Sequence, residues 1–448
     1  MNRRDFLKLS LCAGCSSLIP ALPRLAAAGP IDNVIFNAST YDTNRPQTIM
    51  VFLYGGPSEL AGNFTNYDQF KNLSQTNYAE YFGSNNLLAT THGFWKASGG
   101  DIMEELLAND DLNVFRTCFS QVRWNDNNRS HGICVAQNQR GTFNQDAAGI
   151  FSNLARVLYS KGIIDDTTIM PFLTMEGESG FYARGNLSMI PIIEPISISE
   201  NLDNPFSRSS ERGYSDTMDA LAQARNRALN LSPKITDAFA KRAEMEQFID
   251  NIDGIPDPDL GTNGNEEDLN YENNSFADKL KTAIKIMNYN ADTQVITLGT
   301  GGLGGWDDHN DAENYLGRMD RLFRALRSAV AHIRQVGKIG KINIMVMGDF
   351  GRGLNLNSAN GWDHGNLQNF FLLGGSDYFY TPGVVGETTV SATGSVNRLY
   401  SIPKSGTYWF EPLSVAATIY SIYGITNPEV LTDNQPVISP PGNPLIKG

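Results

Sequence analysis

The segment from Gln294 to Met347 constrains the fold more than any other part of this 448-residue chain. It begins with an apolar run, Gln294-Val-Ile-Thr-Leu298, and ends with a second one, Lys341-Ile-Asn-Ile-Met-Val-Met347. Between the two runs, apolar residues recur at helical spacing over 312–336. Strand, helix and strand in this order predict a βαβ unit, in which the two strands are parallel.

Further apolar runs extend this pattern. The runs over 48–54, 112–119 and 370–375 are typical of strands that are buried on both faces. Amphipathic patterns over 147–161 and 410–423 predict helices that pack on such a sheet. The expected fold class is therefore α/β, a three-layer sandwich with a mostly parallel central sheet.

Two other segments add detail to the expected architecture. Pro171, within a strand-like run over 167–174, predicts an edge strand because proline cannot donate to a ladder of hydrogen bonds. The charged segment 216–250 has a helical pattern and is expected to be peripheral. No linker separates independent domains, so we expect one domain over 29–448 with insertions around 60–100, 176–275 and 376–408.

Residues 1–28 have the features of an export signal. A twin-arginine segment, Asn2-Arg3-Arg4-Asp5-Phe6-Leu7-Lys8, precedes an apolar stretch and the small-residue site Ala26-Ala27-Ala28. We expect the twin-arginine translocase to export the folded chain to the periplasm or the extracellular space. Cys12-Ala-Gly-Cys15 loosely matches a lipidation box, but Cys12 stands where leucine is expected, so lipidation is disfavoured.

Composition excludes some classes of function. Removal of the leader leaves Cys118 and Cys134, which form either one disulfide in an oxidising compartment or two buried free thiols. The formal net charge of −13 disfavours nucleic-acid binding. No stretch approaches the roughly 20 apolar residues of a membrane-spanning helix, so a stable membrane span is not expected.

Carboxylates and histidines follow successive predicted strands. Asp307 and His309 come after the first strand of the βαβ unit, Asp349 comes after the second, and Asp363 and His364 lie on the next glycine-flanked loop. Carboxyl ends of parallel strands meet at one edge of a sheet, and Asp/His sets at such ends hold divalent cations. This pattern predicts a metal-assisted hydrolase site.

Ser130 lies at the predicted start of a helix that runs toward Gln139. Free amide groups and the helix dipole favour an anion at that position. The commoner role of a serine there is to cap the helix, so the spacing leaves both an N-cap and a nucleophile open.

The chain resembles the bacterial exported proteins grouped as domain of unknown function 1501, which are similar to the alkaline phosphatase and sulfatase superfamily. The resemblance rests on the leader and on several short motifs. These motifs are Gly55-Gly-Pro-Ser58, Arg129-Ser130-His131, Gly304-Gly-Trp-Asp307-Asp-His309, Gly348-Asp349-Phe-Gly-Arg352 and Asp363-His364-Gly365.

The resemblance implies specific roles. Asp307, His309 and His364 would ligate one divalent metal ion, and Asp349 would contribute to a second. Zinc is the first candidate, with magnesium, manganese and calcium as alternatives. The implied catalytic residues are Ser130, His131, Arg129 and Arg352. Ser130 would be the nucleophile that attacks phosphorus or sulfur, and His131 lies beside it. Arg129 or Arg352 would bind the ester oxygens.

One departure from the superfamily pattern concerns the first strand. An aspartate usually follows that strand, whereas this chain has Gly55-Gly-Pro-Ser58-Glu59. Either Glu59 substitutes as a ligand or the second metal site is incomplete. The expected function is hydrolysis of an anionic phosphate or sulfate ester. The alternative is a non-catalytic periplasmic binding or assembly protein that keeps the fold.

Overall fold

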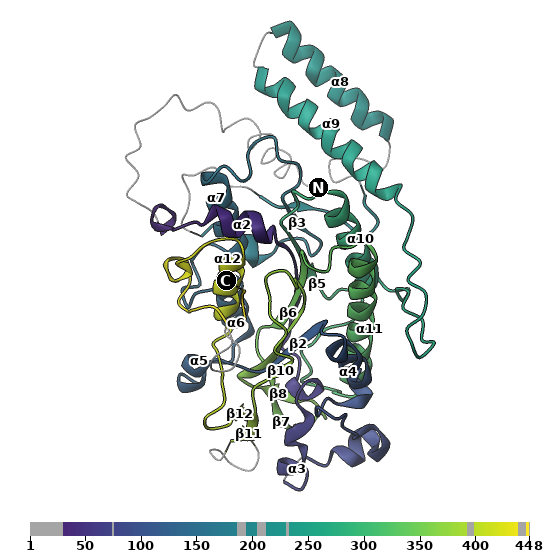
Figure 1. The fold of residues 1–448 in the computed structure, drawn as a ribbon, viewed down its shortest axis with the longest axis vertical. Helices are drawn as coiled ribbons and strands as arrows, with labels where there is room; N and C mark the ends of the chain where they lie inside the picture. Colours follow the sequence, from purple (N-terminus) through teal and green to yellow (C-terminus); the bar gives the residue numbers. More distant parts are fainter. Residues whose placement is uncertain are drawn as a thin grey trace.

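The computed structural model describes residues 30–73, 76–185, 194–203, 212–229, 233–391, 398–437 and 445–447. The predicted export signal lies outside these residues. One eight-stranded sheet forms the centre of the molecule (Figure 1). Its strands are β1 (Gln47–Leu53), β2 (Leu112–Phe119), β3 (Phe172–Thr174), β4 (Ile196–Ser197), β5 (Val295–Gly299), β6 (Ile342–Gly348), β9 (Leu367–Gly374) and β10 (Val384–Val385).

The strand order is β10-β2-β9-β6-β1-β5-β3-β4. β1 pairs in parallel with both β5 and β6, while β9 runs antiparallel to its neighbours β6 and β2. Two small antiparallel sheets join β7 (Arg352–Leu356) to β8 (Trp362–His364) and β11 (Thr388–Val390) to β12 (Ser401–Pro403). The prediction of a mostly parallel sheet is confirmed.

Helices cover both faces of the sheet. The α-helices of the described residues are α2 (Ala38–Asn44), α3 (Tyr67–Phe70), α4 (Gly100–Ala108), α5 (Gln121–Asn125), α6 (His131–Arg140), α7 (Ile150–Ser160), α8 (Arg212–Leu229), α9 (Pro233–Asp253), α10 (Ser275–Tyr289), α11 (Asn314–Gln335) and α12 (Ser414–Ile422). The short helical segments are η1 (Pro30–Asn33), η2 (Glu59–Ala61), η3 (Phe64–Asn66), η4 (Ala79–Gly83), η5 (Ser84–Asn86), η6 (Lys96–Ser98), η7 (Gly180–Tyr182) and η8 (Pro428–Val430).

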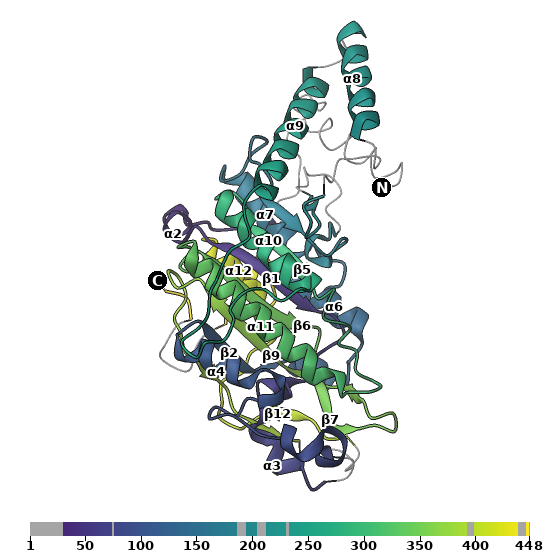
Figure 2. The same ribbon diagram turned by 90° about the vertical axis from the view of Figure 1, so that its right-hand side faces the viewer.

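Alternation along β1 divides the core into two layers. Ile49 and Val51 join the cluster under α4, α10 and α11, whereas Met50 and Phe52 join the cluster under α7 and α12. Figures 1 and 2 show these helix groups on opposite sides of the sheet. Successive side chains of a strand point to opposite faces, so a strand that is apolar throughout requires cover on both. The three-layer sandwich is therefore confirmed.

The structure differs from expectation in the place of one strand and in the number of helices in one segment. The strand that contains the run after Pro171 is not at the edge of the sheet, because the two-residue strand β4 pairs beyond it. The carbonyl of Pro171 accepts hydrogen bonds from the next strand, and its missing N–H is not needed there. The segment 216–250 contains two helices, and Pro233 begins the second, a position at which proline is favoured.

The pair α8 and α9 projects from one end of the sandwich, as expected for a peripheral segment (Figures 1 and 2). Among the described residues, no helix combines the length and apolar character that crossing a bilayer requires. Because β1, β5 and β6 are parallel, their carboxyl ends lie at one edge of the sheet. The loops at this edge carry the predicted site residues.

Candidate metal centre

The loops after β1 and β5 approach each other closely, and glycines make this approach possible. Gly55 adopts φ 111°, and a Cβ atom there would lie 2.5 Å from the backbone nitrogen of Asp307. A Cβ atom on Gly361 would lie 2.1 Å from the carbonyl carbon of His309. A side chain at either position would displace the loop that carries Asp307 and His309.

Four side chains from three parts of the chain gather at this edge. His131, Asp307, His309 and His364 each offer one ligand atom, and these atoms lie within 4.8 Å of one another. His131 is the first residue of α6, Asp307 and His309 follow β5, and His364 ends β8. Sequence reasoning placed three of the four together and assigned His131 to catalysis. The signal for His131 was its place in the Arg-Ser-His triplet after β2.

Distances within this group suit a metal ion that is held by four ligands. Asp307 Oδ1 lies 3.2 Å from His131 Nε2, 3.3 Å from His309 Nε2 and 3.9 Å from His364 Nε2. The Nε2 atoms of His309 and His364 are 2.7 Å apart. Ligands about 2.1 Å from a tetrahedral zinc ion lie about 3.4 Å from each other. The separations within the group, from 2.7 Å up to at most 4.8 Å, bracket this value, so the four atoms could hold one metal ion.

Hydrogen bonds set the tautomers of two of these histidines. His364 Nδ1 lies 2.5 Å from the backbone carbonyl oxygen of Arg129, and a carbonyl oxygen can only accept. His131 Nδ1 lies 2.5 Å from Oδ2 of Asp349, which accepts in the same way. Both Nδ1 atoms are therefore donors, and in the neutral rings both Nε2 lone pairs are left for a metal ion.

Asp349 and Asp363 stand behind the histidines and outside the group of four. The side chain of Asp349 is fully buried, and Asp363 Oδ1 is 3.7 Å from Nδ1 of His309. A carboxylate behind a ligating histidine fixes the ring orientation and raises its basicity. Both aspartates were expected to be metal ligands, and their positions favour this orienting role instead.

Only one such group of histidine and acidic side chains is found in the described part of the chain. The second oxygen of Asp349, Oδ1, is buried and has no hydrogen-bond partner there. That oxygen is available to a second cation, but no further group of at least three ligands surrounds it. The described residues thus supply four ligand atoms for one metal ion, but only the single oxygen of Asp349 for the expected second ion.

Arg352 is fully buried and anchors the loops of the site. Its guanidinium donates to the carbonyl oxygens of Gly55, Gly56, Trp306 and Trp362. Its Nη2 also lies 2.7 Å from Asp307 Oδ1. We expected Arg352 as one candidate to bind ester oxygens, but a guanidinium that is enclosed and engaged in this way orients Asp307 and does not face a substrate.

The charges around the group shift the pKa values of its members. Burial opposes ionisation of Asp307, but the hydrogen bond and the charge of Arg352 outweigh it and lower the pKa of the carboxyl. Burial and then the charge of Arg352 lower the pKa of His364 to about 4. The hydrogen bond to Asp349 raises the pKa of His131. At neutral pH Asp307 is anionic and His364 neutral, the forms that bind metal.

Ser130 occupies the N-cap position of α6, and its side chain makes no capping hydrogen bond. The residue is exposed, and both of its sequence neighbours contact the site, Arg129 through its carbonyl and His131 through its ring. Of the two roles left open for Ser130, the structure therefore does not show the capping one. Ser130 is thus an exposed residue that directly precedes His131 of the group of four.

Comparison with known protein families assigns the part of the chain that carries three of the four ligand residues. A family model described as "Protein of unknown function (DUF1501)" matches residues 195–401. This part of the chain belongs to the DUF1501 family. The matched segment carries Asp307, His309 and His364, whereas His131 comes from outside it.

Other comparisons add little to the DUF1501 assignment. No curated protein matches the chain. One similar solved structure is titled "Crystal structure of Ps i-CgsB in complex with k-i-k-neocarrahexaose" and has 11% sequence identity and a TM-score of 0.39. The similarity covers 87% of this chain and 74% of that chain. Similarity of this degree is too low to establish a shared function.

Residues that sequence reasoning did not single out support the site. The ring of Phe350 lies 4.6 Å, centroid to centroid, from the rings of both His131 and His364. Asn138 donates to the carbonyl oxygen of Asp349, and Arg123 donates to Asn138. Phe350 stood within the quoted Gly-Asp-Phe-Gly-Arg motif, whereas no local pattern distinguished the buried residues of α6 and α5.

Glu59 is buried in η2 and stands outside the group of four. Its carboxyl group lies against Gly351, with the Ser401 hydroxyl nearby. Burial raises the pKa of Glu59 to about 7, although Ser401 and backbone N–H groups oppose the rise. Because Glu59 is buried away from the group of four, the expected substitution of Glu59 for the missing aspartate is not favoured.

This raised pKa gives a testable dependence of stability on pH. Between pH 4.5 and 7 the folded state keeps a proton on Glu59 that the unfolded state has lost, so stability falls as pH rises. We expect the unfolding free energy of the wild type to decline by about 3 kcal/mol over this range relative to Glu59→Gln. Urea titrations of both proteins at several pH values measure the difference. A constant difference would contradict the assignment.

Both cysteines of the described chain are free and buried. Cys118 lies in β2 and Cys134 in α6, and burial raises the pKa of both thiols. Of the two alternatives for this pair, the structure thus has the free thiols. Their burial makes them part of the packing around the sheet.

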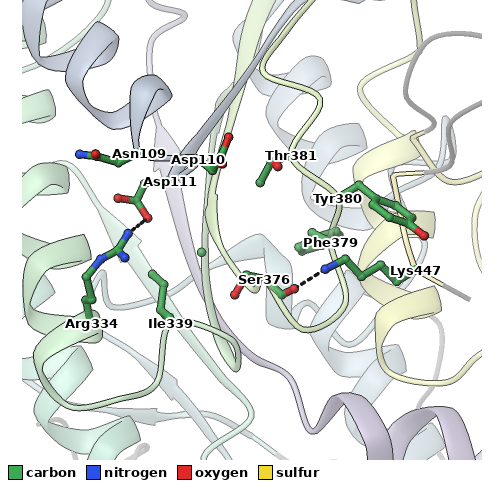
Figure 3. A pocket seen from close by; sticks show the side chains of 11 residues that line it. Asn109, Asp110, Asp111, Arg334, Ile339, Ser376, Phe379, Tyr380, Thr381 and Lys447 are labelled. Atoms are coloured by element: carbon green, nitrogen blue, oxygen red, sulfur yellow. Dashed lines mark hydrogen bonds and ion pairs between the residues drawn. The ribbon is translucent and has the colours of Figure 1, made fainter.

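A cavity of about 250 Å³ lies at the opposite edge of the sheet, where β2 and β6 begin and β9 ends. Asp111, Arg334, Ser376 and Lys447 are among its lining residues, and Figure 3 shows the ion pair of the first two. The length of β6 separates this edge from the His/Asp group by about 20 Å. The cavity is therefore not part of the candidate metal centre.

Proposed function

We propose that the protein is an exported, metal-dependent hydrolase of phosphate or sulfate esters. The observation that carries this proposal is the convergence of His131, Asp307, His309 and His364, with the exposed residue Ser130 directly before His131 in the chain. A metal site next to a nucleophile and a helix N-terminus suits an anionic ester. The twin-arginine segment supports export of the folded protein, which would carry its metal with it.

Three histidines and one aspartate would hold the ion, with zinc as the first candidate. When bound, the metal would supply positive charge that polarises an ester oxygen and stabilises the charge developing during cleavage. The residues of the chain prepare the site for this. Arg129 and Asp349 fix the rings of His364 and His131 through Nδ1, and Arg352 fixes the carboxylate of Asp307.

Ser130 is the proposed nucleophile. Its Oγ would form a bond to phosphorus or sulfur while the bond to the leaving alcohol oxygen breaks, and the serine proton would pass to that alcohol through solvent. Water would then cleave the serine ester, restore the hydroxyl and release inorganic phosphate or sulfate. The amide groups at the start of α6 would attract the ester oxygens against the net negative charge of the chain, whereas the guanidinium of Arg129 donates to Asn366 and Asn127.

Replacing Ser130 by alanine tests this role. We expect Ser130→Ala to lower kcat/KM on the best p-nitrophenyl phosphate or sulfate substrate by about 100-fold or more, with an unchanged metal content. Ser160→Ala, at the exposed end of α7, serves as the matched control and should keep full activity. Elemental analysis accompanies each assay. Full activity of Ser130→Ala at normal metal content would exclude the serine as nucleophile.

The second candidate is a non-catalytic binding protein. The ion pair of Asp307 with Arg352 and the hydrogen bond of His131 with Asp349 favour it, because they stabilise the site without any metal. Elemental analysis of protein purified from its export host separates the two functions. Protein that contains no divalent metal and hydrolyses neither ester would support the binding function.

A further inference from the structure

An aromatic row lies beside the metal centre, defined by Trp409, Phe119, Trp124 and Tyr400. Successive ring centroids are 6.2, 5.8 and 5.5 Å apart, and the Trp409 and Tyr400 rings stand nearly perpendicular to their neighbours. Trp409 is 40% exposed, whereas the three tryptophans Trp95, Trp306 and Trp362 are fully buried. A row of rings that ends on an exposed tryptophan is typical of a binding surface.

The aromatic row borders a cavity of about 200 Å³. Trp409, Phe119 and Trp124 line it, together with polar side chains such as Gln121 and Lys404. Its volume is below the roughly 300–1,000 Å³ of sites for drug-sized ligands, so it holds one ring-sized group. Lys404 pairs with Glu387 at 2.6 Å, so the rim favours a neutral ring over a charged one.

Arg129 connects this cavity to the metal centre. Its guanidinium lies 5.4 Å from the centroid of Trp124 and 4.6 Å from that of Tyr400, and its carbonyl oxygen contacts His364. Trp124 thus contacts Arg129 and also lines the cavity. One residue, Arg129, therefore spans the distance from the cavity lining to His364, and a ligand with two linked rings can occupy the cavity and reach the group of four.

The lining matches the chemistry of a sugar. A pyranose ring has faces of C–H groups that pack on aromatic rings and a rim of hydroxyls that hydrogen-bond to polar side chains. Gln121 and Lys404 already pair with Asn125 and Glu387, and their remaining donor groups can hydrogen-bond to the hydroxyls of such a ring. Nucleic-acid bases also stack on aromatic rings, but the net charge of −13 opposes a polyanion that must be held along its backbone.

We propose that the cavity of the aromatic row is a subsite for a sugar ring and that the substrate is a glycan ester. One ring would occupy the cavity while a neighbouring ring carries the phosphate or sulfate group to the metal centre. This inference rests on the proposed hydrolase function and names its substrate class. Trp409 and Trp124 are the residues that would position the glycan.

A glycan array of neutral, phosphorylated and sulfated oligosaccharides tests the subsite with the full-length protein. Isothermal titration calorimetry then measures the affinity for the best ligand and for the same glycan without its ester group. We expect Trp409→Ala to weaken binding of both by about tenfold, and Trp409→Phe to restore most of the affinity. Tyr289→Ala, which removes an exposed aromatic side chain on α10, is the matched control.

Each outcome has a distinct meaning. The proposal is overturned if no glycan on the array binds, or if Trp409→Ala binds as tightly as the wild type while the array ligand is intact. Retained binding of the ester-free glycan by His309→Ala supports a subsite that is independent of the metal. If binding depends on Trp409 but neither the glycan ester nor p-nitrophenyl esters are hydrolysed, the subsite stands and the hydrolase function fails.

Discussion

Replacing His309 by alanine is expected to weaken zinc binding by more than about 100-fold. Changing a residue that only supports a ligand weakens metal binding by about 10- to 100-fold, and loss of the ligand itself should cost more. His309 supplies one of the four ligand atoms, and its Nε2 lies close to both Asp307 and His364. Because its side chain is 40% exposed, its removal should change the unfolding free energy of the metal-free protein by less than about 0.5 kcal/mol. Zinc affinity is measured by competition with a chromogenic chelator.

His92→Ala provides the matched control for this variant. His92 is also partly exposed and also pairs with a carboxylate, Glu104, at 2.6 Å, but it lies outside the group of four. Its replacement should leave zinc affinity unchanged. If His309→Ala binds zinc as tightly as His92→Ala, the ligand set proposed for this site is wrong.

Arg352→Ala is expected to lower the unfolding free energy by about 3–5 kcal/mol, the effect of breaking a buried polar network. The guanidinium is fully buried and donates to four backbone carbonyl oxygens and to Asp307. These carbonyls belong to the loops after β1 and β5 and to β8. Alanine removes this donor from all four carbonyls, of which that of Trp306 keeps the N–H of Asp308, and releases the loops that carry the metal ligands.

Urea denaturation of the metal-free protein measures this loss apart from any effect on metal affinity. Arg352→Lys should recover only part of it, because an ammonium group cannot reproduce the planar fork of donors. Arg324→Ala is the matched control, since Arg324 is 44% exposed and pairs with Asp320 on the surface of α11. Its cost should stay below about 1 kcal/mol. A similar small cost for Arg352→Ala would contradict the anchoring role.

The main strands were predictable because their residues are apolar without interruption. The runs at β1, β2, β5 and β6 each form a central strand within one or two residues of the expected bounds. The direction of β9 was not predictable, because an apolar strand buried on both faces has the same pattern in a parallel or an antiparallel position. Pairing partners, which lie far away in the sequence, decide between the two.

The sequence predicted where the candidate site lies better than it predicted the role of each residue in it. The sequence placed Asp307, His309 and His364 at one sheet edge, since parallel strands end together there. His131 reaches the same edge through the start of α6. It precedes Asp307 by 176 positions, and no spacing rule connects residues that far apart. Whether a carboxylate ligates or orients depends on distances that only packing sets.

The sequence by itself determined the α/β class and the chemical types gathered at the carboxyl edge, because burial fixes the strand pattern and polar residues must lie where strands end. The tertiary structure decided which atoms face one another. His364 takes its tautomer from a carbonyl 235 positions away, and His131 takes its tautomer from a carboxylate 218 positions away. Such hydrogen bonds need separations below about 3.2 Å, and only the folded chain brings groups so distant in sequence that close.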